Sequence, residues 1–359
     1  MPSLARLGND LYSGRRSVPI GRHRRRWFAI AAAVVVVSLA LLLVRGLNPG
    51  IEFRGGSEFV VSGTENAVEG PARDVLEEVG GQVPRVTIVG GDSVRVQTEE
   101  LSSDETTALK PLLADAYDVP VENVTSSFVG PSWGADVTRK ALQGLVTFLV
   151  LVTLVMAAYF RTWTMAVAAI VALLNDVLVT VGLYAGIGFE VTPASVIGFL
   201  TILGYSLYDT VVVFDKVREN TAGITDQTRI TYGEAANLAV NQTIVRSVNT
   251  SIVGLLPVAS ILFVGALLLG AGTLRDIALA LFIGMIASTA SSIFIAAPLE
   301  VSLRERSAAI AGHTAAVLSR REQAAGGDGT TPAPVPVGGR VAGVHLGNSA
   351  LPRRRRRGR

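Results

Sequence analysis

The sequence predicts a polytopic membrane protein with six transmembrane helices and one small α+β domain outside the membrane. Hydrophobic residues make up 49% of the 359-residue chain and charged residues only 17%, whereas a soluble domain is usually about a quarter charged. The apolar residues also gather into six segments that approach or exceed the ~20 helical residues needed to cross a bilayer. Composition and clustering together predict an integral membrane protein.

The expected spans define the first level of organisation. They lie at residues 27–47, 141–160, 165–187, 192–214, 248–270 and 277–297. The preceding segment, residues 1–26, carries seven arginines, so the positive-inside rule keeps it in the cytoplasm, and an even number of spans returns the C-terminus there. No small-residue cleavage site follows the first apolar run, and we interpret this run as a retained helix rather than a signal peptide.

The segment between the first two spans, residues 48–137, is acidic and has the pattern of a small folded domain outside the cytoplasm. Strands are expected at 57–61, 85–89, 93–97 and 121–128, and helices at 68–79 and 103–117. Gly90 and Gly91 signal a hairpin turn between the two middle strands, and Ser103 or Asp104 is expected to cap the second helix. The order β-α-β-β-α-β is the ferredoxin-like arrangement.

The remaining spans occupy residues 138–300 and contain one long connection, a cytoplasmic loop at 215–246. Within it, residues 232–243 have the spacing of an amphipathic helix lying along the membrane face. Residues 301–359 form a cytoplasmic low-complexity basic tail, because the Gly- and Pro-rich part cannot bury enough apolar surface to fold. The tail ends in an arginine run at 353–357, which either attracts anionic lipid or the ribosome surface or only reinforces topology.

The fourth span contains an acid. Asp209 stands inside an apolar run, and Tyr205 and Thr201 precede it by one and two helical turns on the same face. A carboxylate inside a bilayer costs about 3 kcal/mol or more, so it needs a partner, a cavity or a proton path. Asp209 is therefore a candidate for a group that gains and loses a proton. The alternative is a structural acid held by Tyr205 or by an arginine from another helix.

Two further ionisable residues lie at or near the spans. Arg246 precedes the fifth apolar run, where it either approaches Asp209 and holds it ionised or anchors the end of the span by snorkelling. Asp176 lies near the middle of the third span, as a second proton station or as a hydrogen-bonded helix contact with Thr180, one turn on. The candidate ion-relay residues are therefore Asp209, Arg246, Asp176 and Tyr205.

Composition and motifs also argue against several classes of function. The chain has no cysteine, which rules out a disulfide, a thiol nucleophile or a thiolate metal site. His23, His313 and His345 all lie in the polar tails. No P-loop, zinc-protease, serine-elbow or dinucleotide motif is present, so we predict no enzymatic activity, no cofactor and no metal. The net charge of +3 is small and does not indicate a nucleic-acid partner.

Several motifs, taken in order on this six-span frame, resemble those of the SecF family, the smaller partner in the SecD–SecF accessory complex of the bacterial Sec translocase. Residues 50–56, which read GIEFRGG, resemble the family's G-I-D-F-x-G-G box, and residues 129–134 resemble its V-G-P-x-x-G motif. Residues 204–210, which read GYSLYDT, and 214–220, which read FDKVREN, are similar to its G-Y-S-x-N-D-T and F-D-R-I-R-E-N run. Residues 241–251 and 272–280 are similar to the boxes that begin its fifth and sixth spans. Two residues depart from the pattern: Tyr208 stands where the family has Asn, and Asn175 where it has His.

The resemblance implies a subunit of the bacterial plasma membrane that pairs with a SecD-like subunit beside the SecYEG channel. It further implies that the outer domain helps to move the translocating polypeptide, driven by proton entry past Asp209. Two alternatives remain open: a half-transporter of the resistance-nodulation-division type, and a passive scaffold for the translocase. Exporters of the first kind typically carry two large outer domains in a far longer chain. The coupling ion is either H⁺ or Na⁺.

Overall fold

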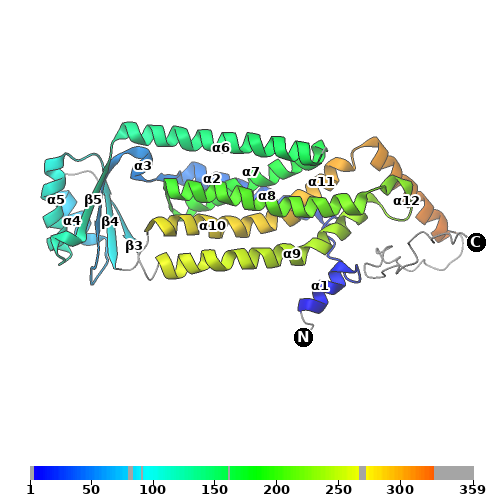
Figure 1. Ribbon diagram of the computed structural model, residues 1–359, viewed down its shortest axis with the longest axis horizontal. Helices are drawn as coiled ribbons and strands as arrows, with labels where there is room; N and C mark the ends of the chain where they lie inside the picture. The colour runs from blue at the N-terminus through cyan, green and yellow to red at the C-terminus, as the bar shows by residue number, and fades with distance from the viewer. Residues whose placement is uncertain (1–3, 80–83, 90–91, 161, 267–271, 327–359) are drawn as a thin grey trace, which may run out of the picture.

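The computed structural model describes residues 4–79, 84–89, 92–160, 162–266 and 272–326, which form an elongated molecule (Figure 1). A small sheet with two helices stands at one end of a bundle of long helices. Helices α1 (Leu4–Tyr12) and α12 (Ala308–Gly326) lie at the opposite end. We call these the domain end and the terminal end of the bundle.

Six helices in the described part of the chain are long and apolar enough to cross a membrane. They are α2 (Arg24–Arg45), α6 (Pro131–Phe160), α7 (Trp163–Ile187), α8 (Pro193–Thr221), α9 (Tyr232–Ser260) and α10 (Gly272–Ser291). The π-helical segment η3 (Ile261–Ala266) continues α9, and η4 (Ser292–Ala296) joins α10 to α11 (Ala297–Arg304). The six predicted spans are thus confirmed as helices within the described residues, and residues 267–270 of the fifth span lie outside them.

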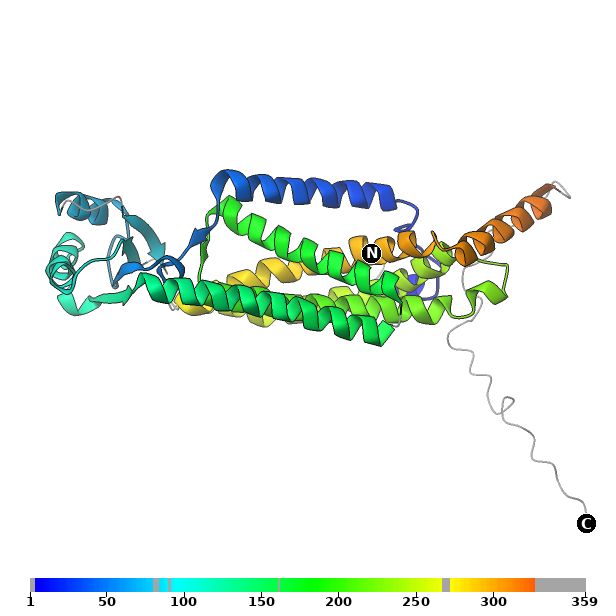
Figure 2. The ribbon, with the colours of Figure 1, turned by 90° about the horizontal axis from the view of Figure 1, so that it is seen from above.

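Helices α7, α8 and α10 form the centre of the bundle. Helix α8 packs on both α10 and α9, while α2 and α6 pack on α7 (Figure 2). Gly284 of α10 allows one close approach, because a β-carbon there would lie 2.1 Å from the Cδ1 atom of Ile202 on α8. The peripheral helices expose large apolar side chains such as Val37, Leu151 and Val253, a surface suited to lipid or to an apolar partner.

The fifth span begins earlier than predicted, and the expected surface helix at 232–243 is wrong. Thr231 and Glu234 form a capping box that starts α9, and no helix breaker follows before the apolar run, so one helix continues through both segments. The cytoplasmic loop predicted at 215–246 shortens to residues 222–231, which contain the 3₁₀ turn η2 (Ile224–Asp226).

The polar face of this extension contacts protein. The side chain of Asn241 accepts a hydrogen bond from the backbone N–H of Val18 at 2.7 Å and donates one to its carbonyl oxygen at 3.0 Å. Helix α1 also packs on α9. The N-terminal segment therefore covers the surface that a membrane-bound helix would present to lipid headgroups.

The tail contains a helix that the sequence analysis did not predict, α12. The guanidinium of Arg321 donates to both carboxylate oxygens of Glu234, at 2.7 and 2.8 Å. His313, expected in a polar tail, is buried and lies 2.7 Å through Nε2 from the carbonyl oxygen of Gln227. The rest of the tail, with its arginine run at 353–357, and the predicted turn at 90–91 lie outside the described residues.

The α/β domain contains its elements in the predicted order. They are β2 (Gly56–Val61), α4 (Gly70–Glu78), β3 (Arg85–Val89), β4 (Ser93–Thr98), α5 (Ser103–Ala116) and β5 (Val124–Val129). The sheet is antiparallel with strand order β3-β4-β2-β5. Alternating residues such as Phe59 and Val61 of β2 are buried against Leu76 of α4 and Leu113 of α5, as the two-residue period of a strand requires.

Two local details of this domain differ from the prediction. Ser102, rather than Ser103 or Asp104, caps α5: its hydroxyl accepts from the N–H of Glu105 at 3.3 Å, and the Glu105 carboxylate accepts from the N–H of Ser102 at 2.8 Å. This is a reciprocal capping box. The expected final strand also begins later, because Val121–Asn123 form the 3₁₀ turn η1 before β5.

A pair of glycines joins the domain to the bundle. After β1 (Asn48–Pro49) and α3 (Ile51–Arg54), Gly55 and Gly56 have φ values of 82° and 133°, a region that favours glycine. A β-carbon on Gly55 would lie 2.9 Å from the Cα of Pro131, and one on Gly56 would lie 2.4 Å from the carbonyl oxygen of Thr98. The two glycines form a tight turn that brings α3 against the start of α6.

We expect residues 48–137 to fold when expressed alone, because their core is self-contained. Leu113→Ala, which empties a fully buried site, should lower the free energy of unfolding by about 2–5 kcal/mol. Leu112→Ala, at an exposed neighbour, should change it by about 0.5 kcal/mol or less. Amide dispersion and urea denaturation measure both. Random-coil amide shifts, or equal effects of the two substitutions, would contradict the expectation.

Candidate functional site

The carboxylate of Asp209 lies in the middle of the bundle, only 5% exposed, and both of its oxygens accept hydrogen bonds. The Ser247 hydroxyl of α9 donates to Oδ1 at 2.7 Å. The Ser292 hydroxyl, at the start of η4, donates to Oδ2. Side chains from α8, α9 and η4 therefore meet at one acid, whose buried oxygens would cost several kcal/mol if left without donors.

A series of hydroxyl groups continues from this acid toward the domain end. Ser251 lies one turn beyond Ser247 on α9, and its oxygen is 2.6 Å from that of Thr289 on α10. The Tyr205 hydroxyl donates to Ser251 at 3.3 Å. Tyr205 is thus connected to the surroundings of Asp209 through α9 rather than bonded to the carboxylate.

Asp176 of α7 forms a second buried acid site. The Ser206 hydroxyl of α8 donates to its Oδ2 at 2.5 Å, and the Asn175 amide donates to Oδ1 at 3.4 Å. Thr180, the expected partner, instead donates to the backbone carbonyl of Asp176 at 2.7 Å. A gap beside the acid, lined in part by Thr180 and Phe199, has no space for a water molecule, so this carboxylate is closed off from solvent.

Arg246 does not approach Asp209, contrary to one of the two predictions for it. Its side chain is exposed on α9, and no ion pair joins it to Asp209 among the contacts of the described residues. Adjacent residues of an α-helix point about 100° apart, and Ser247 occupies the inward position. Thr201 is exposed for a related reason, because each four-residue step drifts by about 40° and two steps carry it away from Asp209.

The serines that bind the acids were not predicted from the sequence. Ser247 and Ser251 are four residues apart, and Ser288, Ser291 and Ser292 have helical spacing in the sixth span. All five are buried. Small polar residues repeated on one face of an apolar helix are a known sign of interhelical hydrogen bonding, so this spacing was the available signal.

A third buried acid, Glu300 of α11, was also missed. It is fully buried near the terminal end, where its Oε1 accepts from the Tyr232 hydroxyl at 2.8 Å. Its Oε2 has no hydrogen-bond partner in the described part of the protein. The sequence feature that could have identified Glu300 is its position as a single acid inside the apolar run at 293–303.

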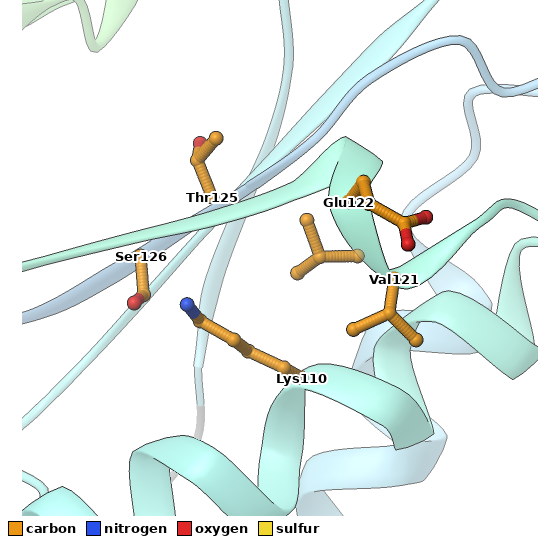
Figure 3. Close-up of a pocket in the computed structure, with 6 residues that line it drawn as sticks. Lys110, Val121, Glu122, Thr125 and Ser126 are labelled. Atoms are coloured by element: carbon orange, nitrogen blue, oxygen red, sulfur yellow. The ribbon is translucent and has the colours of Figure 1, made fainter.

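Other features do not add to this site. A shallow hollow of about 470 Å³ lies between α5 and β5 and is lined by Lys110, Glu122 and Ser126 among others (Figure 3). It belongs to the α/β domain, away from the buried acids (Figure 1). In the parts of the chain that the structure describes, no three His, Asp or Glu residues are grouped to hold a metal ion.

Two family models match the sequence. The model described as protein export membrane protein SecD/SecF, C-terminal, matches residues 109–306, and the SecD/SecF GG motif matches residues 40–66. The subunit SecF of the Streptomyces coelicolor protein translocase is 45% identical over 325 residues, which are 90% of this chain and 87% of that protein. The chain belongs to the SecF family. The Mycobacterium tuberculosis member is 45% identical over 324 residues, covering 87% of this chain and 72% of that one.

Solved structures of the related SecDF protein show the same arrangement of helices. The crystal structure of SecDF from Thermus thermophilus, a translocon-associated membrane protein, matches with a TM-score of 0.73 and 31% identity over 82% of this chain. A super-membrane-facing form of SecDF matches with a TM-score of 0.59 and 30% identity over 85% of this chain. The chain spans 39% and 40% of those two proteins. The four candidate relay residues all fall within the matched family segment, 109–306.

Cysteine pairs can test the inward position of Ser247, since the chain has no native cysteine. Asp209→Cys with Ser247→Cys should crosslink efficiently with a short reagent, because the two side chains are in contact. The matched control is Asp209→Cys with Arg246→Cys, which should crosslink poorly because Arg246 points outward. The result is read as band shift on a gel. Stronger crosslinking of the control pair would overturn the assignment.

Proposed function

We propose that this chain works with a SecD-like subunit to promote polypeptide export through SecYEG, using the proton gradient, and that Asp209 binds and releases the proton. The family places the chain in the protein-export machinery as an accessory membrane subunit. Beyond this family assignment, we propose that the energy comes from the proton gradient and that Asp209 is the residue that carries the proton. Asp176 would be a second station, and Tyr205 would help to hold the hydroxyl series.

One observation carries the role of Asp209: its hydrogen-bond partners are hydroxyl groups. A serine hydroxyl donates to a carboxylate but also accepts from a protonated carboxyl group, so Ser247 and Ser292 can satisfy both charge states. An arginine in their place would hold the acid permanently ionised. A buried acid with hydroxyl partners is thus suited to change its protonation without leaving a polar atom unpaired.

The proposed orientation puts the terminal end in the cytoplasm and the α/β domain outside a bacterial plasma membrane. Supporting it, Arg304 ends α11 and Arg320 lies in α12, two helices at the terminal end (Figure 1), as the positive-inside rule requires. The strand order β3-β4-β2-β5 supports a ferredoxin-like arrangement for this domain. Outside the membrane, such a domain would contact the translocating polypeptide.

The SecD-like partner has support of its own. In Thermus thermophilus a fused SecDF protein contains a stretch 33% identical to 78% of this chain, which covers 38% of the fusion. Arg246 lies on an exposed face of α9, next to Ser247, which contacts Asp209, and a cation at the depth of this acid is costly against lipid. We propose that the SecD-like subunit covers this face and that Arg246 acts in the relay from there. The family match leaves no observation in favour of an independent exporter.

Replacing Asp209 separates an ion-driven subunit from a passive scaffold. Asp209→Asn keeps the size and hydrogen bonding of the side chain but cannot titrate. The variant should assemble normally and lose the stimulation of export by a proton gradient, while Asp209→Glu should keep part of it. Export into inverted vesicles with and without the gradient measures this.

The matched control is Glu219→Gln, the same change at an exposed position of α8, which should export as the unmodified protein does. ATP-driven export should persist in all three variants, because that energy enters through another protein. Full gradient-dependent export by Asp209→Asn would reject the relay and leave the scaffold as the explanation.

Substituting Na⁺ for H⁺ gradients in the same vesicles identifies the coupling ion.

A further inference from the structure

A second polar cluster lies at the domain end, where the α/β domain meets the bundle. The two-residue strand β6 (Glu190–Val191) precedes α8 and pairs in parallel with β1. The backbone N–H of Gly50 extends this pairing by donating to the carbonyl oxygen of Val191 at 2.9 Å. The chain that begins α8 is thus tied to the chain that enters the domain.

Side chains from the sheet reach this junction. Arg95 and Gln97 are two residues apart on β4 and so share one face of the strand. Arg95 Nη1 donates to Glu190 Oε2 at 3.1 Å, and Gln97 Nε2 donates to Glu190 Oε1 at 2.5 Å. Glu58 on β2 accepts from Gln97 at 2.9 Å and lies 3.7 Å from Arg95 Nε. The arginine and both glutamates are less than one-fifth exposed, so these contacts are better shielded than a surface ion pair.

The cluster has more carboxylates than cations. Glu52 of α3 adds a third carboxylate, and its buried Oε2 has no partner among the described residues. A β-carbon on Gly50 would lie 2.5 Å from Glu52 Oε2 and 2.8 Å from Glu190 Oε1, so these two oxygens are near neighbours. Among the described residues, Arg95 is the one cation that forms ion pairs with acids of this cluster.

Charged groups of both signs face this cluster from the surrounding elements. Asp276 of α10, which accepts from the Thr192 hydroxyl at 3.0 Å, adds another carboxylate facing Arg95. Arg85 of β3 and Arg54 of α3 repel each other, and Arg85 also faces Glu190. Arg275 of α10 faces Asp276. With Glu58, Glu190 and Arg95, these are the charged groups that the described neighbouring elements present to Glu52 and its partners.

A proton on Glu52 reduces its repulsion by the carboxylates of Glu190 and Glu58. Burial raises the pKa of Glu52, and the carboxylates of Glu190 and Glu58 raise it further, against the lowering effects of a backbone hydrogen bond and of Arg95. The arrangement in which the α/β domain is held against the start of α8 is therefore favoured at acidic pH. This preference is complete below the ordinary glutamate pKa of 4.5, and it is lost as the pH rises through the raised pKa of Glu52. A protonated Glu52 also gains a hydroxyl donor for a neighbouring carboxylate.

We propose that Arg95, Gln97 and Glu190 form a latch that positions the α/β domain on the start of α8, and that protonation of Glu52 from the domain side tightens it. Asp209 lies sixteen residues after Pro193 on the same helix, about 24 Å along its axis. The latch therefore connects the domain to the helix that carries the relay acid. This link to export rests on the proposed function, whereas the latch itself is a property of the chain alone.

Spin-label distances in the full chain, reconstituted in liposomes, test the latch. One label replaces Thr107 on α5 and the other Ile197 at the start of α8; both positions are exposed. The distance distribution should be narrow at about pH 4.5 and broad at about pH 7.5, because deprotonated Glu52 loosens docking. A second pair, Ile88 and Thr107, lies within the domain and should not respond if the domain stays folded.

Variants test separately the protonation of Glu52 and the contact between Arg95 and Glu190. Glu52→Gln should give the narrow distribution at both pH values, since the amide mimics the protonated acid. Arg95→Ala and Glu190→Arg should each lose the narrow peak, and Arg95→Glu combined with Glu190→Arg should restore it. A merely structural role of Arg95 would not be rescued by the reversal.

Equal distributions for the unmodified chain at both pH values, or a narrow peak in Arg95→Ala, would overturn the proposal. Asp209→Asn in the same label pair should leave the pH response intact. The two hypotheses can therefore fail separately. A wrong relay hypothesis is detected in the gradient-dependent export assay, and a wrong latch hypothesis is detected in the spin-label distances.

Discussion

The need to satisfy a buried carboxylate governs the centre of this protein. Asp209 can lie inside an apolar bundle only if each oxygen has a donor, and short serine side chains supply donors only when the helix backbones are close. This requirement brings α9 and η4 against α8. The same rule operates at Asp176, where Ser206 of α8 donates to an acid of α7. Ser206 and Asp209 stand three residues apart, so one face of α8 bonds to helices on either side.

Much of the fold follows from patterns local in sequence. A run of about 20 apolar residues has few stable conformations other than a spanning helix, and the alternation and turn residues of the α/β domain specify its strands and helices. The wrong predictions concern segments whose structure depends on contacts with residues far away in the sequence. Polar residues at 232–243 suggested a surface helix, yet the N-terminal segment supplies partners for them. Helix α12 depends on contacts such as Arg321 with Glu234, which join segments far apart in the chain.

The candidate site was predictable in part. The cost of a charge in the membrane singles out Asp209 and Asp176 from sequence alone. Helical spacing, however, shows which residues share a face and not which helix that face meets, so Ser247 was overlooked in favour of its neighbour Arg246. Glu300 was overlooked because it lies near the end of a span, where an acid looks solvated. The latch was beyond sequence reasoning, since Arg95 and Glu190 meet only through tertiary structure.

In the proposed mechanism, a comparison of the energies involved favours α8 as the element that moves. A proton gradient supplies about 2.3 kcal/mol per charge per 100 mV, and a hydrogen bond to a charged group contributes about 1.5–3 kcal/mol net. Neutralising Asp209 weakens its bonds to Ser247 and Ser292 by an amount of this order, which is enough to change the balance between two packings of α8 but too small to unfold the bundle. A continuous helix transmits such a shift along its axis. In the proposed mechanism, its two anchored points, Asp209 and the charged junction at the α/β domain, are therefore where a change of protonation has a mechanical effect.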